Sequence, residues 1–336
     1  MAGNSRVVCI IGPGRAGTSL LARLLHTAGM DVGEHTSLAE PKSHNLTGDW
    51  EHPVLSGITQ KILRRLGSTG NTPPDPIHVP FWLAAPNFDA LRNEALSVID
   101  TEFGRSDFWG WKDPPTTLVL PFWQGIIPRI RYIIAMRNPI DMVTSHVKLS
   151  GYSMERSYAI YFAYTIAALM HTRGRPRLIT FYEDLLDHFD DEFERILKFV
   201  EIDPRVASED AIRAAVRKDL RHTQTATDEM LRRTDVPSSF KMLFATLYAA
   251  VEMQKAGDRS FDGMGEAILA FLPSYLLREW RTGEPLCARA WRSISRLVPL
   301  NLRATRVFYD LNRMFEVLSQ EGTAGFWRDA VKRVTA

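Results

Sequence analysis

A glycine-rich segment near the amino terminus has the residue types of an anion-binding loop. It runs Gly12-Pro-Gly-Arg-Ala-Gly17-Thr18-Ser19, which is the spacing of a phosphate-binding loop, but Thr18 stands where a nucleoside triphosphatase has lysine. Glycines let backbone N–H groups converge on an anion, and a following helix N-terminus adds partial positive charge. Without the lysine, metal-assisted γ-phosphoryl transfer is disfavoured. These features favour phosphate binding, with Arg15 as the loop's cation, over a purely structural turn.

A second candidate anion site lies at Arg137, directly after the apolar run 131–136. Asn138-Pro139 then supplies an N-cap and a proline at the first position of a helix predicted over 140–149. The expected apolar face of this helix consists of Ile140, Val143 and Val147, and the expected polar face of Asp141, Thr144, Ser145 and Lys148. Arg137 and Ser145 could together hold a phosphate, although the same arginine also fits ordinary helix-entry chemistry.

Three apolar runs predict the strands that position these groups, at residues 6–11, 131–136 and 177–181. Helical patterns follow them, from Thr18 to a stop at Gly29, over 140–149, and from Tyr182. Strands that alternate with helices predict an α/β fold with a parallel, doubly wound sheet, whose ligands bind at the carboxyl ends of the strands. The glycine loop and Arg137 both fall at such ends.

Composition narrows the class of protein. The chain has 336 residues, 45% hydrophobic and 24% charged, with a formal net charge of +2, which indicates a globular protein rather than a general nucleic-acid binder. Cys9 and Cys287 form neither a disulfide framework nor a metal-binding spacing. No signal peptide or bilayer-spanning run is evident, so we expect a cytoplasmic protein without a nucleic-acid partner.

Two domains are predicted, an α/β domain over 1–257 and a helical C-terminal extension or cap over 258–336. Residues 273–336 hold 11 basic and 6 acidic side chains, a net of +5, with three tryptophans among them. This arm could be a substrate lid, a dimer face or a peripheral contact with anionic lipid or glycan, although an amphipathic helical cap is the simpler interpretation. The oligomeric state stays open.

Taken together, these segments resemble the sulfotransferases that use 3′-phosphoadenosine 5′-phosphosulfate (PAPS), over residues 6–205. The residues that match the family's cofactor site are Gly14, Arg15, Ala16, Gly17, Thr18 and Ser19 of its 5′-phosphosulfate loop, and Arg137 and Ser145 of its 3′-phosphate element. Two further segments resemble bacterial and carbohydrate-type members, Trp111-Lys112-Asp113-Pro114 and Tyr182-Glu183-Asp184-Leu185. The chain departs at Ala16, where serine is usual, and at Pro115, where arginine is frequent.

The resemblance implies sulfuryl transfer from PAPS to a hydroxyl of a carbohydrate, lipid or small natural product, with adenosine 3′,5′-bisphosphate (PAP) as product and no metal. Arg15, Lys112 and Thr18 would then stabilise the leaving 5′-phosphate. The family pattern Asn45-x-x-Gly48-x-Trp50-Glu51 points to Glu51 as the general base, and Glu40 and His44 come next. Glu51 could instead cap the following helix, and Lys112 could form only a surface ion pair with Asp113.

Two other function classes remain. One is a P-loop kinase or NTPase, against which the missing lysine and the lack of a Mg²⁺-binding acid after a strand both argue. The other is a catalytically silent protein that binds PAP. The sequence does not identify the acceptor.

Overall fold

The computed structural model describes residues 5–33, 48–73, 88–203, 209–216, 224–233, 236 and 238–255. Among them the chain forms two compact units. One takes in the described residues within 1–137, 145–151 and 163–223, and the other those within 138–144, 152–162 and 224–336. The predicted boundary at 257 and the predicted extension over 258–336 lie outside the described residues.

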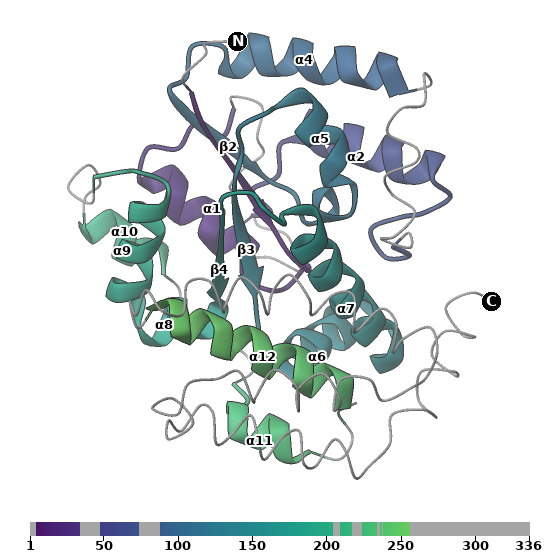
Figure 1. Ribbon diagram of the computed structural model, residues 1–336, viewed down its shortest axis with the longest axis vertical. Helices are drawn as coiled ribbons and strands as arrows, with labels where there is room; N and C mark the ends of the chain where they lie inside the picture. Colours follow the sequence, from purple (N-terminus) through teal and green to yellow (C-terminus); the bar gives the residue numbers. More distant parts are fainter. Residues whose placement is uncertain are drawn as a thin grey trace. The chain divides into compact units, whose positions relative to one another are not determined.

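A parallel four-stranded sheet of order β2-β1-β3-β4 lies in the first unit (Figure 1). Its strands are β1 (Arg6–Ile11), β2 (Phe108–Lys112), β3 (Arg131–Met136) and β4 (Arg177–Phe181). After β1 the chain adds β2 on one side and then β3 on the other, so the direction of winding reverses at β1. Open α/β sheets bind ligands at such a reversal. The predicted parallel, doubly wound α/β fold is therefore confirmed.

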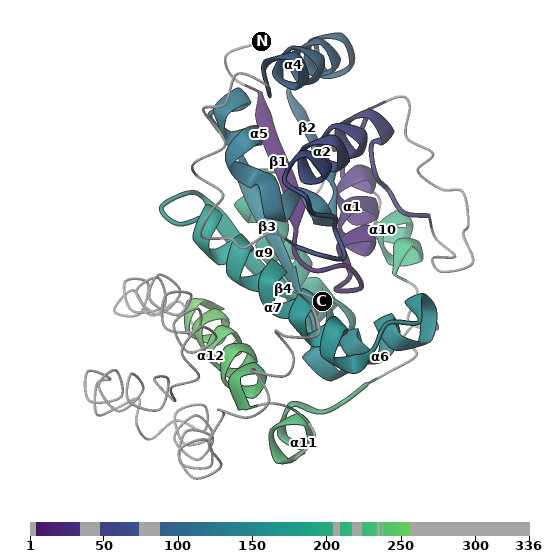
Figure 2. The same cartoon turned by 90° about the vertical axis from the view of Figure 1, so that its right-hand side faces the viewer.

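Helices cover both faces of this sheet, with α1 on one side and α5 on the other (Figure 2). The helices are α1 (Thr18–Thr27), α2 (Pro53–Arg65), α4 (Asp89–Phe103), the 3₁₀ helix η2 (Pro114–Val119), α5 (Leu120–Ile126), α6 (Pro139–Ser150), α7 (Met154–His171), α8 (Tyr182–Asp187), α9 (Phe189–Phe199), α10 (Glu209–Ala215), α11 (Thr227–Arg232) and α12 (Ser238–Lys255). The helices predicted after 6–11, 131–136 and 177–181 correspond to α1, α6 and α8.

Alternate strand residues enter two separate apolar layers. Val8, Ile10, Ile133 and Ala135 pack with apolar residues of α1, α9 and α10. On the opposite face, the Trp111 ring of β2 lies 5.5 Å from that of Trp123 in α5. Burial of each valine or isoleucine side chain in these layers contributes about 1.5–3 kcal/mol. The strand ends that carry the candidate site therefore belong to a firmly packed sheet.

Helix α6 confirms the predicted start and corrects the predicted faces. The Asn138 Oδ1 atom accepts a hydrogen bond from the Ile140 N–H group at 3.0 Å, as an N-cap does. Asp141, expected on the polar face, is only 1% exposed, whereas Val147, expected in the core, is 37% exposed. The Asp141 carboxylate accepts hydrogen bonds from the N–H group and hydroxyl of Thr225, which satisfy it in its buried position.

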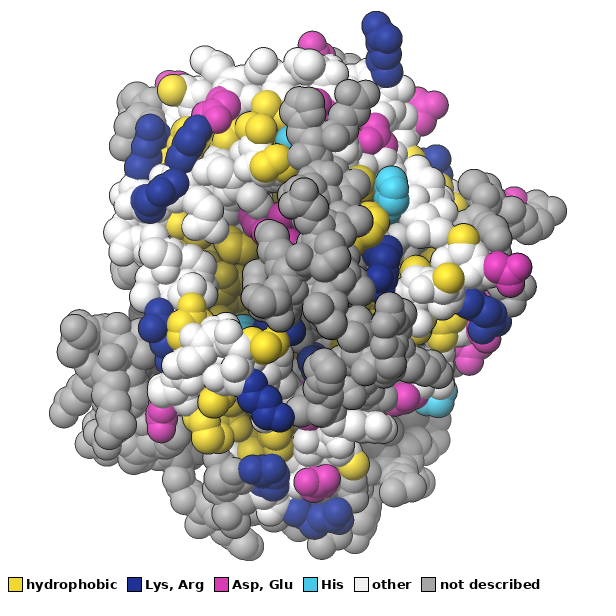
Figure 3. Space-filling model, turned by 180° about the vertical axis from the view of Figure 1, so that it is seen from behind, with side chains coloured by type: hydrophobic (Ala, Val, Ile, Leu, Met, Phe, Trp, Pro, Cys, Tyr) yellow, Lys and Arg dark blue, Asp and Glu magenta, His cyan; other side chains and the backbone are white. Residues whose placement is uncertain are grey.

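Charged side chains of both signs are interspersed on the surface of the described residues (Figure 3). Among these residues, no helix combines the length and apolar character needed to cross a bilayer.

Candidate active site

The loop between β1 and α1 has a backbone that requires glycine at two positions. Gly12 has a φ of +125°, and a Cβ there would lie 2.3 Å from the Ala135 carbonyl oxygen of β3. Gly17 has a φ of +89°, and a Cβ there would lie 2.5 Å from the Tyr182 ring. Gly17 is also the N-cap of α1 and makes no side-chain cap hydrogen bond. The N-terminus of α1 thus keeps the backbone donors that an anion can use.

Two arginines meet beside this loop, from the carboxyl ends of β1 and β3. The Arg15 Nε atom donates to the Ser145 hydroxyl oxygen at 3.0 Å, and an Arg137 Nη1 atom donates to the Arg15 carbonyl oxygen at 3.3 Å. The Arg137 guanidinium lies 4.7 Å from the centre of the Tyr182 ring. Burial, and then the charge of Arg137, lower the pKa of Arg15. Two partly buried cations that repel each other are suited to an anionic ligand.

His146, next to Ser145 on α6, also borders the loop. A Cβ on Gly14 would lie 3.8 Å from its Nε2 atom, and the residue is buried. Burial, and then the charge of Arg15, lower the pKa of His146 to about 4, so its imidazole is neutral at neutral pH. Sequence reasoning missed this residue, and the one available signal was its place beside Ser145.

Lys112 and Glu51, predicted separately, form an ion pair. The Lys112 Nζ atom lies 2.6 Å from Glu51 Oε1, with the lysine side chain 2% exposed and the glutamate side chain 35% exposed. The N-cap of α2 is His52, whose Nδ1 atom accepts from the Leu55 N–H group at 3.3 Å. Lys112 and Asp113 are both buried, so they do not form a surface ion pair. The Glu51–Lys112 pair thus has a buried cation and an accessible carboxylate.

Asp113 follows Lys112 and is the N-cap of η2. Its carboxylate accepts hydrogen bonds from the Ser56 hydroxyl at 2.8 Å and from the hydroxyl and N–H group of Thr116 at 2.8 and 3.1 Å. Burial, and then the negative charge of Glu51, raise the pKa of Asp113 to about 6, against the opposing effects of these hydrogen bonds and of Lys112. Cys9 of β1 also lies within its electrostatic reach.

Replacing Asp113 with asparagine is expected to change how stability depends on pH. Because the pKa of Asp113 is raised from 3.8 to about 6 on folding, the folded chain binds this proton more tightly than the unfolded chain. The group therefore favours folding most below about pH 4, and this contribution is lost as the pH rises to about 6. In urea unfolding, the free energy of unfolding of the wild type minus that of Asp113→Asn should therefore decrease as the pH rises from about 4 to about 6.

Asp100→Asn is the matched control for that titration, because Asp100 is exposed. A difference between wild type and Asp113→Asn that stays constant from pH 4 to 6.5 would contradict the raised pKa.

The comparison with protein-family models identifies the family. Residues 8–205 match the model of the sulfotransferase family. The chain belongs to this family. No curated protein matches this sulfotransferase. Among solved structures, it is similar to the sulfotransferase domain from the Synechococcus PCC 7002 olefin synthase, at 16% identity and a TM-score of 0.39, over 69% of this chain and 84% of that one.

Every described candidate residue of this sulfotransferase lies within the matched range. The structure brings the loop residues 14–19 together with Arg137 and Ser145 at one edge of the sheet, and places the Glu51–Lys112 pair at the end of the neighbouring strand β2. Glu40 and His44, the other candidate bases, lie outside the described residues. Among the side chains that are described, no group of three or more histidine, cysteine or acidic residues could hold a metal ion.

Proposed function

We propose that this sulfotransferase uses PAPS as donor and a hydroxyl of a carbohydrate, lipid or small natural product as acceptor, and releases PAP. The observation that carries the proposal is the convergence of Arg15 and Arg137 at the ends of β1 and β3. A nucleotide with phosphates at both the 5′ and 3′ positions has two anionic groups for these two cations. Arg137 and Ser145 would bind the 3′-phosphate, and Arg15 with the loop would bind the 5′ group.

The loop also fits the donor better than it fits ATP. When bound, PAPS supplies the sulfuryl group, and its 5′-phosphate is the leaving group. The backbone amides of residues 14–19, the hydroxyls of Thr18 and Ser19, and Arg15 would bind that phosphate without a loop lysine. Each hydrogen bond to a charged group contributes about 1.5–3 kcal/mol, and the most useful ones strengthen as charge develops on the leaving oxygen.

Glu51 would take the proton from the acceptor. As the acceptor oxygen bonds to sulfur, its proton passes to the Glu51 carboxylate, and the electron pair of the breaking S–O bond stays on the 5′-phosphate. The half-exposed Glu51 side chain can meet an incoming hydroxyl, while one oxygen remains bonded to Lys112. Lys112 would orient the base and stabilise the negative charge that spreads over the sulfuryl oxygens.

Ligand-dependent melting tests the donor site. At about 100 times its dissociation constant, PAP should stabilise the folded chain by about 2.7 kcal/mol, which raises the melting temperature by about 5 °C. ATP at the same concentration should give a much smaller shift, because the loop has Thr18 in place of lysine.

Transfer of labelled sulfate from PAPS to a panel of hydroxyl acceptors tests the activity itself. Transfer would distinguish an enzyme from a silent PAP-binding protein. An absence of stabilisation by millimolar PAP, or an equal response to ATP, would contradict the proposed donor.

A further inference from the structure

Two buried hydrogen bonds to consecutive residues of η2 connect the phosphate loop with helix α2, the helix that begins just after Glu51. At the loop, the Gly12 N–H group donates to the Thr117 hydroxyl oxygen at 3.0 Å. At the helix, the hydroxyl oxygens of Thr59 and Thr116 lie 3.0 Å apart. Thr116 and Thr117 are consecutive residues of η2, so one short segment contacts both the loop and α2.

The hydrogen bonds from α2 converge on Asp113. The Thr116 hydroxyl donates its proton to Asp113, so in the contact with Thr59 it must accept, and Thr59 donates. Ser56, three residues before Thr59 on α2, donates directly to the same carboxylate. Asp113 therefore terminates two hydrogen-bond paths from α2.

The polar side chains of this arrangement are buried, which indicates that they do more than fill space in the core. Thr59, Thr116 and Thr117 are 0% exposed, and Asp113 is 1% exposed. Burying hydroxyls and a carboxylate costs free energy that their hydrogen bonds only offset, whereas valine would fill the threonine positions without that cost. A fully bonded polar network fixes relative orientation more sharply than apolar contacts, because each bond requires a particular distance and angle.

The same segment holds the chain on both sides of the start of α2. Lys112 bonds to Glu51, which lies just before the helix, and Asp113 bonds to Ser56 in the first turn of the helix. Residues 48–52 have no regular secondary structure of their own. Residues 112–117 therefore hold the chain around Glu51 from both sides, in addition to the Ser19 hydroxyl of the loop, which donates to the Asp49 carbonyl oxygen at 3.2 Å.

We propose that residues 112–117, called the connector from here on, position Glu51 against the phosphate loop and transmit nucleotide binding from the loop to α2. Asp113, Thr116 and Thr117 are then positioning residues, and Ser56 and Thr59 are their partners on α2. This inference rests on the proposed function in one respect, since it takes PAP as the ligand of the loop.

Hydrogen–deuterium exchange of the full chain with and without PAP tests the connector. In the wild type, PAP should slow exchange both in residues 12–21 and in α2, the latter by about fivefold or more, as expected for two coupled sites. In Thr117→Val and in Asp113→Asn, the loop should still be protected by saturating PAP, while the protection of α2 falls below about twofold. In Asp113→Asn, the amide NH₂ group would replace one of the two carboxylate oxygens that accept from Ser56 and Thr116. Two donors would then face each other, and at least one of these hydrogen bonds would be lost.

Thr172→Val is the matched control, because Thr172 is equally buried and its hydroxyl contacts neither the loop nor α2: it donates to the Ala168 carbonyl oxygen at 2.7 Å and accepts from an Arg177 Nη1 atom at 3.3 Å. It should keep PAP protection in both segments. If Asp113→Asn does not fold, Ser56→Ala replaces it, since Ser56 is only half-buried. The dissociation constant for PAP, measured by calorimetry, accompanies each variant.

The outcomes separate the two proposals. Loss of α2 protection in the connector variants, with loop protection retained, supports the connector. If PAP protects the wild-type loop but not α2, or if the variants protect α2 as well as the wild type does, the connector is wrong and the donor site stands. If PAP protects no part of the wild-type loop, the proposed donor is wrong and the connector falls with it.

Discussion

Arg137→Ala is expected to weaken PAP binding about 100-fold or more. Arg137 is 8% exposed, is held over the Tyr182 ring and is bonded to the Arg15 carbonyl oxygen, so its guanidinium is oriented before the ligand arrives. Loss of two charge-assisted hydrogen bonds to one phosphate removes about 3 kcal/mol or more. Calorimetric titration with PAP at fixed ionic strength measures the change.

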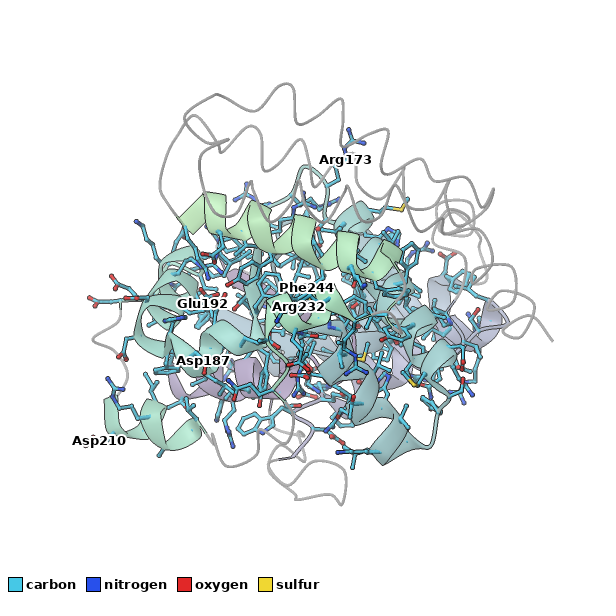
Figure 4. All side chains as sticks on the ribbon, turned by 90° about the horizontal axis from the view of Figure 1, so that it is seen from below. Arg173, Asp187, Glu192, Asp210, Arg232 and Phe244 are labelled. Atoms are coloured by element: carbon cyan, nitrogen blue, oxygen red, sulfur yellow. The ribbon has the colours of Figure 1, made fainter. Side chains whose placement is uncertain are left out.

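Two further variants serve as controls for Arg137→Ala. Arg137→Lys keeps the charge but loses the bidentate geometry, so its affinity should fall between those of wild type and Arg137→Ala. Arg173→Ala removes an exposed arginine that precedes β4, at the amino-terminal side of the sheet, and should leave PAP binding unchanged (Figure 4). Unchanged affinity in Arg137→Ala, with the fold intact by circular dichroism, would overturn the assignment of Arg137 to the 3′-phosphate.

Glu51→Gln is expected to lower kcat by about 10²- to 10⁴-fold, the usual contribution of a general base. The amide keeps the shape of the side chain and an oxygen that can accept from Lys112, but it cannot take the acceptor proton. Affinity for PAP should stay within about twofold, because Glu51 contacts the lysine rather than the loop. Turnover of PAPS with an identified acceptor, together with PAP titration, gives both values.

Glu94→Gln is a close control for this substitution. Glu94 is also paired with a lysine, Lys61, at 2.7 Å, and its side chain is 36% exposed against 35% for Glu51. Because Lys61 is 46% exposed and Lys112 is 2% exposed, Glu94→Gln controls for the loss of an accessible paired carboxylate, and not for the buried charge that Glu51→Gln leaves on Lys112. Full activity in Glu51→Gln would instead direct attention to Glu40 or His44 as the base.

Local patterns in the sequence were sufficient for most of the sheet. Runs of β-branched residues between turn residues predicted β1, β3 and β4, and the same turns located the loop and Arg137. Strand β2 was missed because Gly110 interrupts the short aromatic run Phe108–Lys112. The structure explains that glycine, since a Cβ at this position would lie 2.3 Å from the Val8 carbonyl oxygen of β1.

Contacts between distant residues were beyond such patterns. Helical periodicity placed Asp141 on a polar face, because a periodic pattern contains no information about a hydrogen-bond partner 84 residues away in the sequence, here Thr225. The Glu51–Lys112 pair joins residues 61 apart, and only the family resemblance had given each of them a role. Neither the connector threonines nor His146 has a sequence signature, since isolated threonines and a histidine have many structural uses.

The order of the strands has a consequence for biosynthesis. The loop that follows β1 leaves the ribosome well before two of its neighbours. The Ala135 carbonyl oxygen against which Gly12 packs and the Thr117 hydroxyl that binds its N–H group emerge more than 100 residues later. Contacts of such sequence separation form late, because a long stretch of chain must first be closed into a loop. A nascent chain that stops before residue 117 would carry the glycine loop without either of these neighbours. With the donor site proposed above, PAP is expected to stabilise the chain only after β3 has paired with β1.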